Sequence, residues 1–196
     1  MKVSLNILTK DPSKCESKTR LRDILTDKER EFITKEMLDI TCKSLSELKC
    51  DKYIHVYPNS SGLFMKDLSK KYGFNLLNQS EGRLSYKIFH ALNFQKDKYI
   101  KRILIGSDIP SISKFEINSS IKYLDKFDCI FGPSNDNGFY LMAVKNNSHC
   151  IIDGLDHDCI KLEDLKYRCK SQNKSYKFNC LALGAVQTEM LDQAFP

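Results

Sequence analysis

The position of Asp108 in the sequence would allow its carboxylate to bind a metal ion or a sugar hydroxyl. It follows the apolar run Ile103-Leu104-Ile105 and the pair Gly106-Ser107, and Pro110 comes two positions later. An apolar run that ends in glycine and proline is typical of a buried parallel strand that stops at the edge of an α/β sheet. Ligands bind outside the carboxyl ends of such strands, so Asp108 is a candidate metal ligand.

A second acidic turn lies about two dozen residues further on, at Asp136. It belongs to the cluster Gly132-Pro133-Ser134-Asn135-Asp136-Asn137-Gly138-Phe139-Tyr140. A carboxylate in such a turn could hold an acceptor or act as a base. The pair Asn137-Gly138 is equally typical of the corner of a plain hairpin, in which Tyr140 would be an ordinary sheet residue. Asp108, two residues before Pro110, also has a plain alternative as a turn former.

Basic residues are concentrated just after the first predicted strand. Within thirteen positions the chain carries Lys10, Lys14, Lys18, Arg20 and Arg22. Lysine and arginine side chains bind phosphate oxygens, and arginine can do so with two parallel hydrogen bonds. The segment is therefore a candidate polyphosphate-binding loop, although a solvated surface loop would have the same composition.

Composition bounds the class of protein. The chain has 196 residues, 41% of them hydrophobic and 29% charged, which suits one globular domain spanning 1–196. No apolar run reaches the roughly 20 residues of a membrane helix, and the start is too short for a signal-peptide core, so we expect a cytoplasmic protein without a membrane partner. The net charge of +6 is spread along the chain, which ranks nucleic-acid binding last. Eight cysteines without a C-x-x-C pair indicate reduced thiols, and those near His149 fit no common zinc spacing.

Strand-like and helix-like segments alternate along the chain. Capping boxes begin helices at Thr26-x-x-Glu29 and Ser113-x-x-Glu116, and Gly73 is typical of a helix C-cap. Strands are predicted at 2–8, 53–57, 74–77, 100–106, 128–131, 139–144 and 175–183, and helices from Thr26, at 62–72, 83–95, 113–126 and 162–171, and at the C-terminus. Such alternation predicts an α/β fold with a mostly parallel sheet and helices on both faces.

The basic loop, the Asp108 segment and the Asp136 segment resemble, in this order, three motifs of a family of small bacterial transferases. These are the glycosyltransferases of the arsenosugar-biosynthesis or radical-SAM-associated type. Lys10-Asp11-Pro12 and Lys18-Thr19-Arg20-Leu21 resemble its K-x-P and K-T-R-L, and Gly106–Pro110 resembles its G-x-D-x-P. Gly132–Leu141 resembles its G-P … D-G-G-Y-Y-L, and Gln79–Arg83 resembles a Q-x-G-D-L segment. The basic loop and the helix after it are also similar to those of 2-phospho-lactate guanylyltransferase.

The resemblance implies the GT-A fold of nucleotide-diphospho-sugar transferases and a set of roles. Asp108 and Asp136 would be catalytic, with Asp108 also holding Mg²⁺ or Mn²⁺. Substrate and phosphate would contact Lys10, Lys18, Thr19, Arg20, Gly82, Gly138 and Tyr140. The expected reaction moves a glycosyl group from a nucleotide-sugar to a small acceptor, and nucleotidyl transfer from an NTP is the alternative. A homodimer is left open.

The chain departs from the family pattern in three places, and two of them, at Cys15 and near the C-terminus, favour a further alternative, a catalytically inactive nucleotide-binding protein. Cys15 replaces a glycine of the basic loop, and Asn137 replaces the first glycine of D-G-G. Near the C-terminus the family has D-x-D-T, which supplies a second metal carboxylate, whereas this chain has Ala185-Val186-Gln187-Thr188-Glu189. With Asp108 as the one metal carboxylate, we expect an ion that is held weakly unless substrate is bound.

Overall fold

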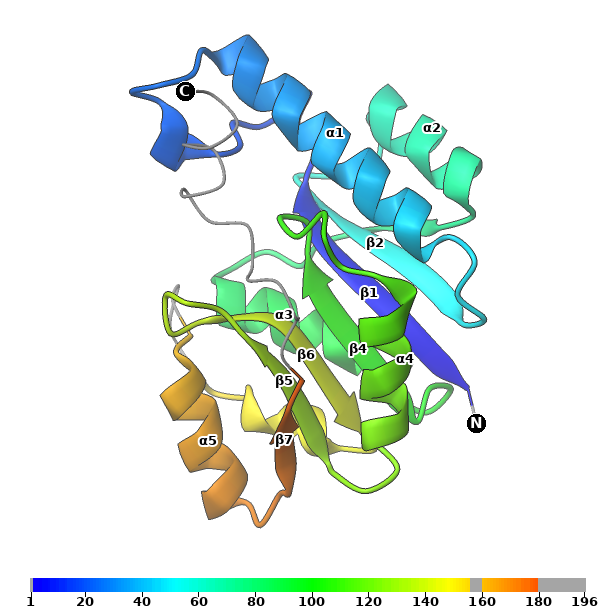
Figure 1. The fold of residues 1–196 in the computed structure, drawn as a ribbon, viewed down its shortest axis with the longest axis vertical. Coiled ribbons are helices and arrows are strands. Elements are labelled where there is room, and N and C mark those ends of the chain that lie inside the picture. Colours follow the sequence, from blue (N-terminus) through cyan, green and yellow to red (C-terminus); the bar gives the residue numbers. More distant parts are fainter. Residues whose placement is uncertain (1, 156–159, 180–196) are drawn as a thin grey trace.

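A computed structural model describes residues 2–155 and 160–179 of the protein. A seven-stranded sheet forms its centre (Figure 1). The strand order is β3-β2-β1-β4-β6-β5-β7. All neighbouring strands pair in parallel except β6, which runs antiparallel to both β4 and β5. The strands are β1 (Val3–Lys10), β2 (Asp51–Tyr57), β3 (Asn75–Asn78), β4 (Lys101–Gly106), β5 (Cys129–Pro133), β6 (Phe139–Lys145) and β7 (Tyr176–Phe178). The predicted mostly parallel α/β sheet is confirmed.

Helices cover both faces of this sheet. They are α1 (Asp27–Leu45), α2 (Leu63–Tyr72), α3 (Leu84–Asn93), α4 (Lys114–Tyr123) and α5 (Leu162–Ser171), with short 3₁₀ helices η1 (Thr19–Leu21) and η2 (Ser148–Ile151). One hydrophobic cluster joins α1, α2 and α4 to the sheet, and a second joins α3 and α5 to it (Figure 1). No helix in the described part of the chain is both long and apolar enough to cross a membrane.

Alternation along the strands separates the two clusters. In β4, Ile103 and Ile105 belong to the first cluster and Leu104 to the second. In β5, Ile130 belongs to the first cluster while its neighbour Phe131 belongs to the second. Successive side chains of a strand point to opposite faces, so a continuous apolar run indicates a strand buried on both sides.

Local signals set the helix ends as predicted. Thr26 and Ser113 form complete capping boxes at the start of α1 and α4, each with the glutamate three residues later. Gly73 ends α2 in the left-handed conformation, with φ of 69°. The predicted terminal helix and residues 180–183 of the last predicted strand lie outside the described residues.

Candidate functional site

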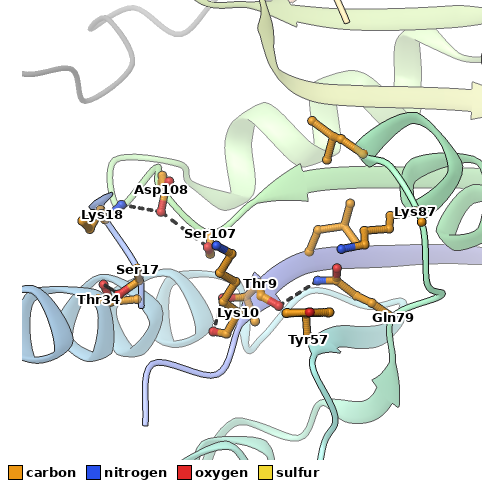
Figure 2. A pocket seen from close by; sticks show the side chains of 13 residues that line it. Thr9, Lys10, Ser17, Lys18, Thr34, Tyr57, Gln79, Lys87, Ser107 and Asp108 are labelled. Atoms are coloured by element: carbon orange, nitrogen blue, oxygen red, sulfur yellow. Dashed lines mark hydrogen bonds and ion pairs between the residues drawn. The ribbon is translucent and has the colours of Figure 1, made fainter. Parts of the chain in front are cut away.

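A pocket lies at the carboxyl ends of the parallel strands, where the sheet and the loops after it leave a cavity of about 470 Å³ (Figure 2). This volume is in the range of small-molecule sites. Because β1, β2, β3 and β4 are all parallel, their carboxyl ends meet at this edge. The pocket is lined by Leu8, Thr9, Lys10, Ser17, Lys18, Thr34, Tyr57, Gln79, Gly82, Leu84, Lys87, Ser107 and Asp108.

Lys18 and Asp108 meet at one end of this pocket. Their side chains form an ion pair across 90 positions of sequence (Figure 2). The Lys18 side chain is only 14% exposed, whereas that of Asp108 is 65% exposed. Lys18 adopts a left-handed backbone conformation, with φ of 52°, directly before η1. The basic loop and the acidic strand end therefore converge on one pocket.

Asp11, at the start of the basic loop, fixes the course of its first residues. Its backbone N–H donates to the carbonyl of Tyr57 at 2.8 Å, and its own carbonyl accepts from the N–H groups of Lys14 and Cys15, each at 3.0 Å. One carboxylate oxygen accepts from the N–H of Ser13 at 3.0 Å, and the side chain is fully buried. Asp11 of the Lys10-Asp11-Pro12 motif therefore stabilises this turn, a role that we did not predict from the sequence.

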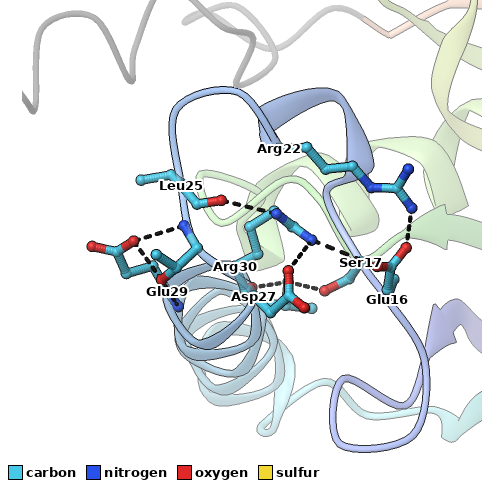
Figure 3. A network of polar contacts seen from close by, with 9 residues as sticks. Glu16, Ser17, Arg22, Leu25, Asp27, Glu29 and Arg30 are labelled. Atoms are coloured by element: carbon cyan, nitrogen blue, oxygen red, sulfur yellow. Dashed lines mark hydrogen bonds and ion pairs between the residues drawn. The ribbon is translucent and has the colours of Figure 1, made fainter.

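The second half of the basic loop is tied to the first turns of α1 (Figure 3). Arg30, which is 3% exposed, donates to the carbonyl of Leu25 at 2.8 Å and to Asp27 at 2.7 Å, and it lies 3.8 Å from Glu16. Glu16 also forms an ion pair with Arg22. Charge-assisted hydrogen bonds of this kind are stronger than neutral ones, so they brace the segment that presents Lys18.

Five of the predicted site residues do not line the pocket. Thr19 and Arg20 lie in η1 beside Lys18, and both are exposed. The other three, Asp136, Gly138 and Tyr140, belong to the β5–β6 hairpin. Lys10, Lys18, Gly82 and Asp108 are the predicted site residues that do line it.

Asp136 builds the corner of the β5–β6 hairpin. One of its carboxylate oxygens accepts from the hydroxyl of Ser134 and, at 3.2 Å, from the N–H of Gly138. These bonds, with that of Ser134 the strongest, lower the pKa of Asp136, and the positive charge of Arg20 adds to the shift. Asn137 has a φ of 64°, which fits the hairpin alternative given by the sequence.

Tyr140 belongs to the core rather than to the pocket. It is 6% exposed, and its hydroxyl donates to the carbonyl of Asn179 at 2.8 Å. A Cβ atom at Gly132 would lie 2.4 Å from its ring, so the glycine makes room for the tyrosine. This contact gives a structural reason for the Gly132 and Tyr140 spacing in the motif.

Gln79 and Lys87 complete the far side of the pocket (Figure 2). The Gln79 amide nitrogen donates to the carbonyls of Thr9, at 2.7 Å, and His55, at 2.9 Å, which fixes its orientation. The Lys87 ammonium lies 4.3 Å from the centre of the Tyr57 ring. The sequence held a weak signal for Gln79, in the segment that resembles Q-x-G-D-L, and none for Lys87.

Positive charge predominates in the pocket. Three lysines (Lys10, Lys18 and Lys87) and one carboxylate (Asp108) line it, which leaves an excess of two positive charges. Side chains of this kind attract and orient anionic groups, phosphates above all.

Comparison with known families identifies the chain. A family model described as "Uncharacterized protein conserved in bacteria (DUF2064)" matches residues 41–157, more than half of the sequence. The chain belongs to the DUF2064 family. The match includes the strand that leads to Asp108 and the β5–β6 hairpin, and it begins after the basic loop.

A relative of this DUF2064 protein is the 2-phospho-L-lactate guanylyltransferase of Methanobrevibacter smithii. The two are 29% identical over 131 residues, which cover 66% of this chain and 57% of the relative. The chain thus spans little more than half of the relative's length. The resemblance to 2-phospho-lactate guanylyltransferase inferred from the basic loop is confirmed.

Solved structures show the same fold as the DUF2064 protein. A protein of Desulfovibrio desulfuricans whose name assigns it to the nucleotide-diphospho-sugar transferases superimposes with a TM-score of 0.80 at 20% identity, covering 92% of this chain and 80% of that one. The 4-diphosphocytidyl-2C-methyl-D-erythritol synthase of Anaerococcus prevotii gives 0.64 at 13% identity, with coverage of 98% and 94%. The predicted GT-A-type fold is confirmed.

Among the described residues that line the pocket, Asp108 is the one carboxylate that could hold a metal ion. Residues 2–155 and 160–179 contain no group of three or more His, Cys, Asp or Glu side chains that could hold a metal ion. Asp108 is the acidic residue of the pocket lining, and it is already paired with Lys18. The segment Ala185–Glu189, which the sequence analysis compared with the D-x-D-T motif of the transferases, lies outside the described residues. Asp108 thus fits an ion whose remaining ligands come from a bound phosphate chain.

Proposed function

We propose that this DUF2064 protein is a nucleotidyltransferase, which transfers a nucleotidyl group from a nucleoside triphosphate to a small acceptor. The observation that carries the proposal is the meeting of Lys18 and Asp108 at the carboxyl ends of the parallel strands. A cation beside a carboxylate is the pair of groups that a triphosphate and its counter-ion require. The name of the guanylyltransferase relative supports this reaction class.

In the proposed reaction an acceptor oxygen attacks the α-phosphorus of the donor. A bond forms between these two atoms, the bond from the α-phosphorus to the bridging oxygen breaks, and pyrophosphate leaves with the electron pair. When the acceptor oxygen belongs to a hydroxyl group, its proton is released to solvent. Lys10 and Lys18 would bind the oxygens of the leaving pyrophosphate, where negative charge accumulates. A divalent ion such as Mg²⁺ or Mn²⁺, when bound, would neutralise the same charge, and Asp108 would hold it.

The pairing of Lys18 with Asp108 affects how such an ion could bind. An ammonium already occupies the carboxylate, so a metal ion alone would have to displace it. A triphosphate would draw Lys18 towards its own oxygens and bring further oxygen ligands for the metal. We therefore expect the metal ion and the nucleotide to bind together, and the metal ion alone to bind weakly.

Glycosyl transfer from a nucleotide-sugar is the second candidate. The sequence favoured it because the segment Asp136-Asn137-Gly138-Phe139-Tyr140 resembles that group of transferases, and the neighbour with the TM-score of 0.80 carries a nucleotide-diphospho-sugar transferase name. Both donors present a diphosphate to the pocket. Their products differ, because nucleotidyl transfer releases pyrophosphate whereas glycosyl transfer releases a nucleotide.

The decisive experiment combines binding with product analysis. The four nucleoside triphosphates and a panel of nucleotide-sugars would be titrated calorimetrically with Mn²⁺ and then incubated with hydroxyl and oxyanion acceptors, including 2-phospho-L-lactate. We expect a triphosphate to bind and pyrophosphate to be released. Release of a nucleotide from a nucleotide-sugar would instead support glycosyl transfer. Binding without either product would support the inactive nucleotide-binding protein, and no binding of any donor would refute the proposal.

Asp108→Asn tests the role of the carboxylate. The substitution keeps the size of the side chain but removes the charge, and we expect turnover to fall at least about a hundredfold, as for loss of a charged group that assists departure of the pyrophosphate. Asp67→Asn, at an exposed position of α2 outside the pocket lining, is the matched control. Equal activity of the two variants would contradict the role of Asp108.

A further inference from the structure

A second cavity adjoins the pocket at Gly82. It measures about 650 Å³ and lies between the start of α3 and the turn that follows η2. Gly82 lines both cavities. Its φ of +101° is a conformation that side-chain-bearing residues rarely adopt, and a Cβ atom there would lie 3.3 Å from the Tyr86 ring. Because residue 82 is a glycine, no side chain projects into the boundary between the two cavities at this position.

The walls of the second cavity are mainly apolar. Tyr86 and Phe89 of α3 face Ile152 and Leu155 of the turn after η2. Tyr86 is 51% exposed and Ile152 is 1% exposed, so the cavity has an open side and a buried floor. Apolar and aromatic walls of this size are typical of sites that bind the body of a small organic molecule.

Neighbouring rings hold the two aromatic walls in place. The Tyr86 ring lies 4.2 Å from the ring of His90, and the Phe89 ring lies 5.4 Å from that of His149, between ring centres. The carbonyl of Asp153 accepts from the guanidinium of Arg168, which ties the turn after η2 to α5. A ligand would therefore enter a preformed site, which lowers the entropic cost of binding.

The two cavities differ in charge. The first has three lysines and one carboxylate, whereas the second has the carboxylates of Glu81 and Asp153 and the guanidinium of Arg83. The second cavity thus carries an excess of one negative charge, against an excess of two positive charges in the first. It is suited to a molecule without net negative charge, and the first to a polyanion.

We propose that the second cavity binds the acceptor of the reaction. This acceptor has an apolar body, either aromatic or aliphatic, and no net negative charge. This inference rests on the proposed function, because it needs the donor in the first pocket. The body would lie against Tyr86 and Phe89, and its reactive oxygen would reach the donor past Gly82. The guanylyltransferase relative is named after 2-phospho-L-lactate. This molecule carries both a phosphate and a carboxylate, so it does not match the walls of the second cavity.

Benzyl alcohol and benzoate are suitable probes, because they share one ring and differ in charge. Saturation-transfer NMR on the full chain would measure the affinity of each. We expect benzyl alcohol to bind more tightly than benzoate, and Tyr86→Ala to weaken benzyl alcohol binding about tenfold through loss of an aromatic wall. Tyr167→Ala, which removes a 73% exposed ring of α5 outside the cavity lining, is the control and should leave binding unchanged. Tighter binding of benzoate, or equal effects of the two variants, would overturn the inference.

A titration with GTP and Mn²⁺ separates this inference from the proposed function. Bound Mn²⁺ in the first pocket would accelerate the relaxation of benzyl alcohol protons in the second. Tyr86→Ala would reduce this effect about tenfold at low benzyl alcohol concentration, in line with the weaker binding, while leaving GTP affinity within about twofold. If GTP binds but benzyl alcohol binding does not depend on Tyr86, the acceptor site is refuted and the proposed function stands. If benzyl alcohol binds in a Tyr86-dependent way but no triphosphate binds, the proposed function and the acceptor role are both refuted.

Discussion

Lys18→Met should have opposite effects on two ligands of the first pocket. The ammonium of Lys18 is expected to bind donor phosphate oxygens, and in the described structure it also pairs with Asp108. Removing it should weaken the binding of GTP. The same change leaves Asp108 without its competing cation, so Mn²⁺ alone should bind more tightly. Methionine has similar length to lysine and keeps the backbone constraint at φ of 52° unchanged.

The magnitudes follow from the exposure of the two side chains. A hydrogen bond to a charged group contributes about 1.5–3 kcal/mol, and Lys18 is only 14% exposed, so the GTP dissociation constant should rise about 10- to 150-fold. Asp108 is 65% exposed, and exposed ion pairs stabilise a protein by roughly 0–1 kcal/mol. The free energy of unfolding should therefore change by less than about 1 kcal/mol.

Calorimetric titration of GTP and of Mn²⁺, together with urea unfolding, measures all three quantities. Lys14→Met is the matched control, because Lys14 belongs to the same loop but contacts Asn59, at 2.6 Å, and does not line the pocket. If Lys18→Met and Lys14→Met weaken GTP binding equally, general attraction by the loop explains binding. The assignment of Lys18 to the phosphates would then be wrong.

Three further predictions concern stability. Gly132→Ala should destabilise the protein by about 1–3 kcal/mol in urea unfolding, because the new Cβ atom would overlap the Tyr140 ring, whereas Gly106→Ala, with open space around it, should not. Ser113→Ala should cost about 1 kcal/mol in the same assay through loss of the N-cap of α4, and an unchanged midpoint would contradict that role. Burial lowers the pKa of His55 to about 4, so the unfolded chain binds a proton that the folded protein does not between pH 6.5 and 4. Unfolding midpoints should therefore fall as the pH decreases through this window, and less steeply in His55→Gln.

The sequence predicted the elements well because their signals are local. The apolar run before Asp108, the capping boxes at Thr26 and Ser113 and the glycine after α2 each lie within a few residues of the feature that they determine. Part of the site was predictable for a related reason. Lys10 ends β1, and Lys18 and Asp108 lie in the loops after β1 and β4, strands whose carboxyl ends must meet in a parallel sheet.

The rest of the site could not be predicted in this way. Lys87 reaches the pocket because α3 packs beside β1 and β4, and its sequence neighbours give no sign of this. Tyr140 belongs to the motif that suggested a binding role, yet its ring packs against Gly132 and its hydroxyl binds the backbone at Asn179. Motif membership does not distinguish a residue that contacts a ligand from one that shapes the core beneath it.

Taken by itself, the amino-acid sequence determined which segments become strands and helices and which loop carries the positive charge, because periodicity, caps and turns act over short distances. The tertiary structure decided the strand order, the pairing of Lys18 with Asp108, and the meeting of two cavities of opposite charge at Gly82. These features join residues that are far apart in the chain. They depend on how whole helices pack on the sheet, which no local pattern of residues specifies.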